Sequence, residues 1–186
     1  MLGFNKTIAV IVLMFIFGVG SIASAQSLHN FLDQLKVGEW VEVEGVPQND
    51  ASLLIEEIKV IYGELEEDDY EINGIVDTVL PGEKKIFILN LPVVFDKYTE
   101  YDDKHDAINA FADIKTGNYV EIEGSFLRDS TFLAKEIGLK KSKKKEQNIF
   151  EWRGKVQSVN PANNSLVILG HTVILTPGTK IKSFTR

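Results

Sequence analysis

The residues best suited to chemistry in this sequence are two pairs of glutamates, Glu42/Glu44 and Glu121/Glu123. On a β-strand, residues i and i+2 project from the same face, so each pair presents two carboxylates side by side. Such a pair can hold a cation, or can act as general acid and base when the environment separates the two pKa values. Alternating glutamates are more often the solvated face of a half-exposed sheet, and we favour that interpretation here.

Other catalytic and metal-binding patterns are missing from the sequence. The chain has three histidines and no cysteine, and no two histidines lie at the spacing of zinc ligands. No Gly-x-Ser-x-Gly elbow offers a nucleophile, and the acidic segment 102–106 lacks the spacing and the glycine of a calcium loop. We therefore expect a non-enzymatic protein with no catalytic residues, no metal and no cofactor.

The glutamate pairs belong to an eight-residue motif that occurs twice. Residues 38–45 read Gly-Glu-Trp-Val-Glu-Val-Glu-Gly, and residues 117–124 read Gly-Asn-Tyr-Val-Glu-Ile-Glu-Gly. The alternation predicts two equivalent strands whose valines and isoleucine face a core and whose glycines mark the strand boundaries. A shift of 79 residues aligns 35–58 with 114–137, and a shift of 80 aligns 70–101 with 150–181. The mature chain is therefore a tandem duplication of a hairpin half followed by a three-strand half.

A short amphipathic helix is predicted before each hairpin half, over residues 27–35 and 106–114. Ser27 and Asp106 are the expected N-caps. Three strands, a helix and two strands is the order of an OB-fold, a five-stranded partly open barrel. The fold class is therefore mainly β, with two OB-like barrels.

One of these barrels is complete in the chain and the other is divided between its ends. Residues 63–141 contain a whole barrel, whereas residues 26–62 are a hairpin half and residues 142–186 a three-strand half. Each half alone would expose a sheet edge and an apolar face, so we expect the two halves to pair into a second, permuted barrel. A domain-swapped dimer that uses the same halves is the rival arrangement.

Residues 1–25 have the pattern of a secretory signal peptide. Lys6 is the only charge, residues 8–19 are apolar, and Ala-Ser-Ala at 23–25 precedes Gln26 as a cleavage site. The apolar run is shorter than the ~20 residues of a spanning helix, although an uncleaved anchor is the alternative. We expect an exported protein, periplasmic or secreted, without a membrane span after cleavage.

Aromatic and basic residues supply the remaining candidate binding groups. Trp40 and Tyr119 have the phase of the glutamates and are expected to face outward, against the helix, the other barrel or a partner; we favour packing over a platform for oligosaccharides. A lysine-rich linker is the equivalent, with opposite sign, of the acidic run at 64–69. Solvated linkers are the simplest interpretation, and the alternatives are attraction between the two runs or contact of the lysines with lipid headgroups or a cell-wall polymer. The lysines of this linker are Lys140, Lys141, Lys143, Lys144 and Lys145.

The two motifs resemble a bacterial family, the domain of unknown function 5666. The resemblance rests on the Lys-x-Gly-x-x-Val-Glu-x-Glu-Gly pattern at 115–124, and on Gly74, Val76, Leu89 and Thr99 in the preceding strands. It implies exported β-rich modules, often in tandem, with no assigned catalytic residues. It covers nearly all of the mature chain, which departs from the family's usual arrangement by opening with a hairpin half.

These features lead to one leading hypothesis and two alternatives. The leading hypothesis is an exported, non-enzymatic module that binds, or forms part of, another envelope component, either a protein or a polymer. The alternatives are a binding protein for a small ligand, cation or oligosaccharide, and a carboxylate-dependent hydrolase of envelope polymers. The net charge of −7 argues against nucleic acid as a partner, because neutralising phosphates requires a basic surface.

Overall fold

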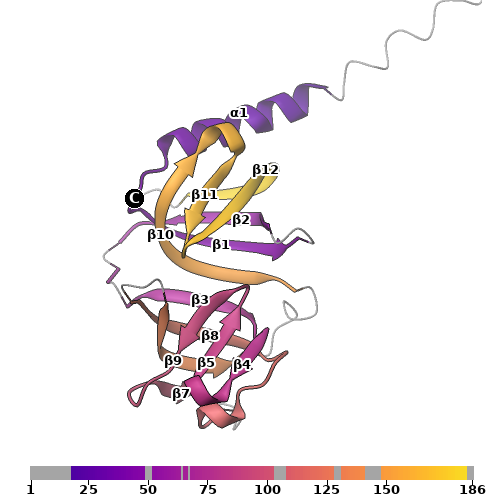
Figure 1. Ribbon diagram of the computed structural model, residues 1–186. Helices are drawn as coiled ribbons and strands as arrows, with labels where there is room; N and C mark the ends of the chain where they lie inside the picture. Colours follow the sequence, from indigo (N-terminus) through magenta and orange to yellow (C-terminus); the bar gives the residue numbers. More distant parts are fainter. Residues whose placement is uncertain are drawn as a thin grey trace, which may run out of the picture.

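The protein is mainly β. The computed structural model describes residues 18–48, 52–63, 65–66, 68–102, 108–127, 131–140 and 148–183. Its one α-helix among these residues is α1 (Gly18–Gln34), which lies across one end of the molecule, over β10, β11 and β12 (Figure 1). The strands are β1 (Trp40–Pro47), β2 (Leu53–Ile61), β3 (Tyr70–Ile75), β4 (Thr78–Leu80), β5 (Lys85–Ile88), β6 (Leu91–Val94), β7 (Glu100–Asp102), β8 (Tyr119–Phe126), β9 (Phe132–Leu139), β10 (Phe150–Asn160), β11 (Ser165–Ile168) and β12 (His171–Ser183).

The two ends of the chain close one five-stranded barrel. The strand order is β1-β2-β12-β11-β10, and β10 also pairs with β1, which completes the ring. Val41 lies opposite Gly154 and Val43 opposite Trp152 in the antiparallel β1–β10 ladder. The prediction that the N-terminal hairpin pairs with strands from residue 150 onward is therefore confirmed, and it holds within a single chain.

The other strands continue from β10 through β3 as the row β3-β8-β9-β6-β5-β4, with β7 beside β9. The segment between β3 and β4 connects the two ends of this row. Val76 exchanges backbone hydrogen bonds with Gly117 and Asn118 just before β8, and the Asp77 N–H donates to the Phe87 carbonyl in β5. These bonds favour closure of residues 63–141 into a complete barrel. Closure of this barrel stays a prediction, because β3 and β4 do not pair with each other as strands.

The two repeats meet at a seam between equivalent strands, β3 and β10. In this antiparallel pair Ile72 lies opposite Trp152, and these two residues are related by the repeat shift of 80. Glu71 lies opposite Arg153, and Asn73 opposite Glu151. Because equivalent residues face each other in an antiparallel pair, the repeats are related by an approximate two-fold axis at the seam.

The alternation of the sequence places one face of each strand in the core. Val41, Val43, Val120 and Ile122 are completely buried, as predicted. The final glycines of the motif differ from the prediction, because Gly45 and Gly124 lie inside β1 and β8 rather than at a boundary. Both follow a register shift, and a Cβ atom at either position would lie 2.2 Å or 2.1 Å from a backbone carbonyl oxygen of the neighbouring strand. Close backbone approach at a β-bulge therefore requires glycine.

The predicted helices are only partly correct. Ser27 is not an N-cap, because α1 already begins at Gly18 and its buried Leu28 and Leu32 pack into the core. The second helix is a single 3₁₀ turn, η2 (Phe111–Asp113), while Asp106 lies outside the described residues. The Asp113 carboxylate accepts the backbone N–H groups of residues 109 and 110, so a local turn replaces the longer helix.

The predicted signal peptide lies largely outside the described residues. Its cleavage site, before Gln26, falls within α1. Among the described residues, no helix combines the length and the apolarity that crossing a bilayer requires.

Candidate functional site

The two candidate aromatic residues are buried. Trp40 is 7% exposed and Tyr119 is 1% exposed, so neither side chain is open to solvent. The Trp40 ring centroid lies 4.6 Å from that of Tyr70, which belongs to β3 on the other side of the seam, and Lys155 Nζ lies 5.3 Å from the Trp40 ring centroid. Trp40 therefore packs between the repeats, which was the favoured interpretation of this residue.

The candidate glutamates lie on the outer face of a sheet that spans both repeats. Glu42 is opposite Lys59 on β2 and Arg153 on β10, and on the other side of the seam Glu71 is opposite Glu123 on β8. Three of the four candidates, Glu42, Glu44 and Glu121, are half-buried, and Glu123 is exposed. The solvated-face interpretation therefore holds fully only for Glu123.

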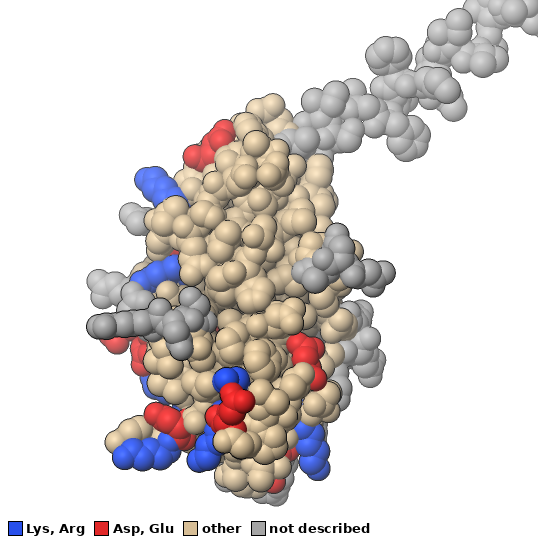
Figure 2. Space-filling model, in the orientation of Figure 1, with Lys and Arg blue, Asp and Glu red and all other residues tan. Residues whose placement is uncertain are grey.

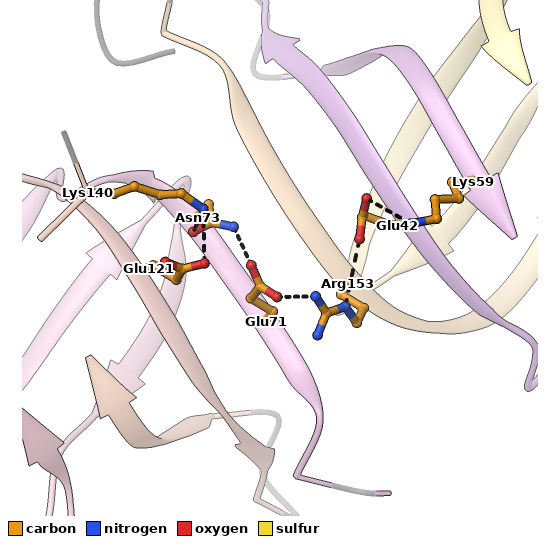
Figure 3. A network of polar contacts seen from close by, with 7 residues as sticks. All are labelled: Glu42, Lys59, Glu71, Asn73, Glu121, Lys140 and Arg153. Atoms are coloured by element: carbon orange, nitrogen blue, oxygen red, sulfur yellow. Dashed lines mark hydrogen bonds and ion pairs between the residues drawn. The ribbon is translucent and has the colours of Figure 1, made fainter. Parts of the chain in front are cut away.

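A polar network crosses the seam on this face (Figure 3). Arg153 on β10 forms an ion pair with Glu71 and lies 3.8 Å, Nε to Oε2, from Glu42. Lys59 Nζ lies 3.7 Å from the other Glu42 oxygen. The Asn73 amide donates to Glu71 Oε1 at 2.6 Å. The network thus joins four strands: β2 contributes an ammonium group, β1 a carboxylate, β10 a guanidinium, and β3 a carboxylate and an amide.

The same network continues from β3 to β8 and to the end of β9, within residues 63–141. Lys140 Nζ donates to Glu121 Oε1 at 2.9 Å and to Asn73 Oδ1 at 3.4 Å. Asn73 is completely buried, and its amide is satisfied on both sides. The network therefore fixes the repeats to each other by side chains as well as by the β3–β10 ladder.

Burial raises the pKa of Glu71 above the usual value of 4.5. The side chain loses most of its hydration at the seam, and this effect outweighs the Arg153 charge and the Asn73 hydrogen bond, which lower the pKa. The nearby Glu121 carboxylate raises it further. Desolvation can exceed the attraction within an ion pair when both charges leave water, so the ionised form of Glu71 is costly in the folded protein.

We expect the Glu71→Gln variant to be more stable than the wild type at neutral pH. Because the folded pKa is raised, the contribution of Glu71 to stability is fully present below its unfolded pKa and is lost as the pH rises through its folded pKa. The variant cannot ionise and retains the amide-compatible contact with Asn73. Urea unfolding of both proteins between about pH 3.5 and pH 8 measures the difference.

The two free energies of unfolding should converge at the acidic end of that range and separate as the pH rises. Glu123→Gln is the matched control, since Glu123 is an exposed glutamate on the same face. A Glu71→Gln variant that becomes less stable than the wild type as the pH rises would show that the Arg153 pair outweighs desolvation.

A small acidic hollow lies beside the network in the second repeat. It has a volume of about 160 Å³ and is lined by Gly138 and four carboxylates, those of Asp102, Glu121, Glu123 and Glu136. The described residues contain no group of three or more potential ligands arranged to hold a metal ion. Of the candidate lysines, Lys140 is in the network, while Lys141, Lys143, Lys144 and Lys145 lie outside the described residues.

A second and larger hollow is a groove along α1, beside the barrel formed by the chain ends. Its volume is about 740 Å³. We call the exposed carboxamides of α1 in its lining the wall, and the buried and half-buried apolar side chains the floor; Tyr62, which also lines it, is 45% exposed. The lining residues are Gln26, Ser27, Asn30, Phe31, Gln34, Leu35, Glu39, Val60, Tyr62 and Ile181.

Neither the groove nor the seam network was predicted from the sequence, although each left a signal. Gln26, Asn30 and Gln34 recur every four residues, which places them on one face of a helix. At the seam, Glu71 and Glu151 match in the repeat alignment, but Asn73 corresponds to Arg153. A charged residue that breaks a repeat on an otherwise equivalent strand indicates a contact specific to one copy.

Comparison with known proteins identifies a family but no individual relative. The model of the family described as domain of unknown function, DUF5666, matches residues 22–59, 73–138 and 153–186. No curated protein and no solved structure matches the chain. The first matched segment starts inside α1 and the last covers most of β10 to β12, so the match includes both halves of the closed barrel.

Proposed function

Since the chain belongs to the DUF5666 family, whose description assigns no activity, we propose from its geometry that it is an exported, non-enzymatic binding module of the bacterial cell envelope. The α1 groove is the observation that carries this proposal. Its volume of about 740 Å³ is within the range of roughly 300–1,000 Å³ that ligand pockets occupy. Its lining combines apolar side chains with polar groups that can orient a ligand.

The surroundings of the groove also favour binding. Tyr62 and Val37 are two large apolar side chains that remain well exposed, at 45% and 67%. Tyr62 lines the groove, and Val37 lies two residues from the lining residues Leu35 and Glu39. On the face shown in Figure 2, charged side chains gather toward the end opposite α1 and are sparser near the helix. An exposed aromatic side chain that lines a hollow offers apolar surface to a ligand.

A hydrolase of envelope polymers is the second candidate. The observation in its favour is the raised pKa of Glu71 beside Glu121, since perturbed carboxylates cluster at active sites. The ion pairs weigh against it, because Glu42, Glu71 and Glu121 each have a cationic partner. Glu71 is also 8% exposed, which leaves little access for a polymer substrate.

Thermal unfolding of the exported chain with envelope fragments tests the proposal. We expect at least one of three probes, soluble muropeptides, chitotetraose or a pooled peptide library, to raise the melting temperature by a few degrees, because a ligand present at about 100 times its Kd adds ~2.7 kcal/mol. Calcium chloride serves as the comparison and should leave the melting temperature unchanged. Absence of a shift with every probe, or mass-spectrometric detection of cleaved probe, would contradict a non-enzymatic binding module.

A further inference from the structure

The wall of the α1 groove contains a ladder of carboxamides. Gln26, Asn30 and Gln34 lie on successive turns of the helix, and their side chains are exposed. Residues four apart on an α-helix are separated by about 6 Å along the axis. The Gln26 amide donates to Asn30 Oδ1 at 3.1 Å. This hydrogen bond aligns the first two carboxamides along the helix axis.

The floor of the groove is apolar and comes from three elements. Phe31 and Leu35 belong to the helical segment and the turn after it, Val60 to β2 and Ile181 to β12. Leu35 and Val60 are buried, while Phe31 and Ile181 are half-buried and complete the apolar surface. A ligand in the groove would therefore meet polar groups along one side and an apolar strip beneath.

The charges at the groove exclude a polyanion. The residues that line it include no lysine or arginine, and their one carboxylate, that of Glu39, accepts the backbone N–H of Lys36 at 2.9 Å. The side chains that line the groove therefore offer a phosphate-rich or sulfated polymer no cation, and the α-amino group that cleavage before Gln26 would create is a single charge at one end of the groove. An uncharged ligand matches the electrostatics of this surface.

We propose that the groove binds an uncharged polypeptide segment in extended conformation, with its backbone along the carboxamide ladder. This inference rests on the proposed function. An extended chain repeats every two residues, about 6.6 Å, which is close to the ladder spacing of about 6 Å. Each carboxamide offers a donor and an acceptor, which complement the N–H and C=O of one backbone residue. Alternate side chains of the ligand then point to the apolar floor.

An oligosaccharide fits the same groove less well. Sugar rings stack on aromatic faces, and Tyr62 is the exposed ring in the lining. The floor is mainly aliphatic, and Phe31 is half-buried. The spacing of the carboxamides matches the two-residue repeat of an extended peptide backbone, and the aliphatic floor matches its apolar side chains.

Peptides selected from a random dodecapeptide phage library on the immobilised exported chain provide the probes. Synthetic copies are measured by fluorescence anisotropy against wild type and Asn30→Ala/Gln34→Ala, with Gln26 left unchanged because predicted cleavage makes it the first residue. Alanine favours helix, so this variant should fold. The matched control is His29→Ala/Asp33→Ala, which removes an exposed contact between two side chains of the same helix that do not line the groove.

We expect uncharged peptides with alternating apolar residues, whose affinity falls at least about tenfold in the ladder variant and less than about twofold in the control, since the variant removes the hydrogen bonds of two carboxamides. N-methylation of alternate backbone amides in the peptide should cause a similar loss. Peptides that bind both variants equally, or that tolerate N-methylation, would overturn the inference. Groove-dependent binding of chitotetraose instead would overturn it while leaving the proposed binding module intact.

Discussion

Removal of residues 149–186 is expected to unfold the N-terminal hairpin while the strands between residues 70 and 140 keep their protection from hydrogen exchange. β1 pairs with β2 and β10, and β2 pairs with β1 and β12. Without β10 and β12 the hairpin is an isolated two-stranded sheet, which is at best marginally stable in water. The surface of α1 that packs on β12 would lose its partner as well.

Hydrogen exchange followed by mass spectrometry resolves the two regions. Peptides from β1 and β2 should exchange as in an unfolded chain, while peptides from β8 and β9 should retain slow exchange. A chain that ends at residue 183 is the control and should behave as the full-length protein. Rapid exchange throughout the truncated chain would show that residues 63–141 do not form a complete barrel by themselves, and retained protection in β1 would show that the hairpin needs no partner.

Replacement of Trp152 by alanine is expected to lower the free energy of unfolding by about 3–5 kcal/mol, the usual cost of deleting a large buried aromatic side chain. Trp152 is completely buried at the centre of the seam, opposite Val43 on one side and Ile72 on the other. Its ring centroid lies 4.9 Å from that of Phe150 and 5.3 Å from that of His171. The cavity would therefore open where the closed barrel meets the second repeat.

Trp152→Phe is the matched control for this substitution. It keeps an aromatic ring and removes the indole N–H, which is buried without a hydrogen-bond partner among the described residues. We expect a cost of less than about 1.5 kcal/mol, because loss of an unsatisfied polar group offsets part of the lost packing. Urea unfolding monitored by far-UV circular dichroism measures both variants. An alanine variant as stable as the phenylalanine variant would mean that Trp152 contributes little to the seam.

The repeat pattern was sufficient to predict how the chain ends come together. Two hairpin halves and two three-strand halves at nearly equal shifts left one half unpartnered at each end. An uncovered apolar face and open strand edges are unfavourable, so pairing of residues 28–61 with residues 149–184 followed. The ladder between these segments is present in the structure.

The burial of Trp40 and Tyr119 shows where strand phase stops being informative. Phase correctly assigned these residues to the face of the glutamates, and packing was the favoured interpretation, but phase alone could not choose between the helix, the other barrel and a partner as the cover. Tyr70 reaches Trp40 only because β3 pairs with β10. A residue on the outer face of one barrel is therefore buried by the edge of the next.

The β-rich class, the duplicated strands and the pairing of the chain ends could be predicted from the sequence, because alternation and spacing are local properties that repeat along the chain. The seam at Ile72 and Trp152, the desolvation of Glu71 and the groove along α1 became visible in the folded chain. Each of these depends on which outer surfaces approach each other in three dimensions. Strand alternation specifies the face on which a side chain lies, and the packing of the two repeats and the helix determines whether that face is open, covered or hollow.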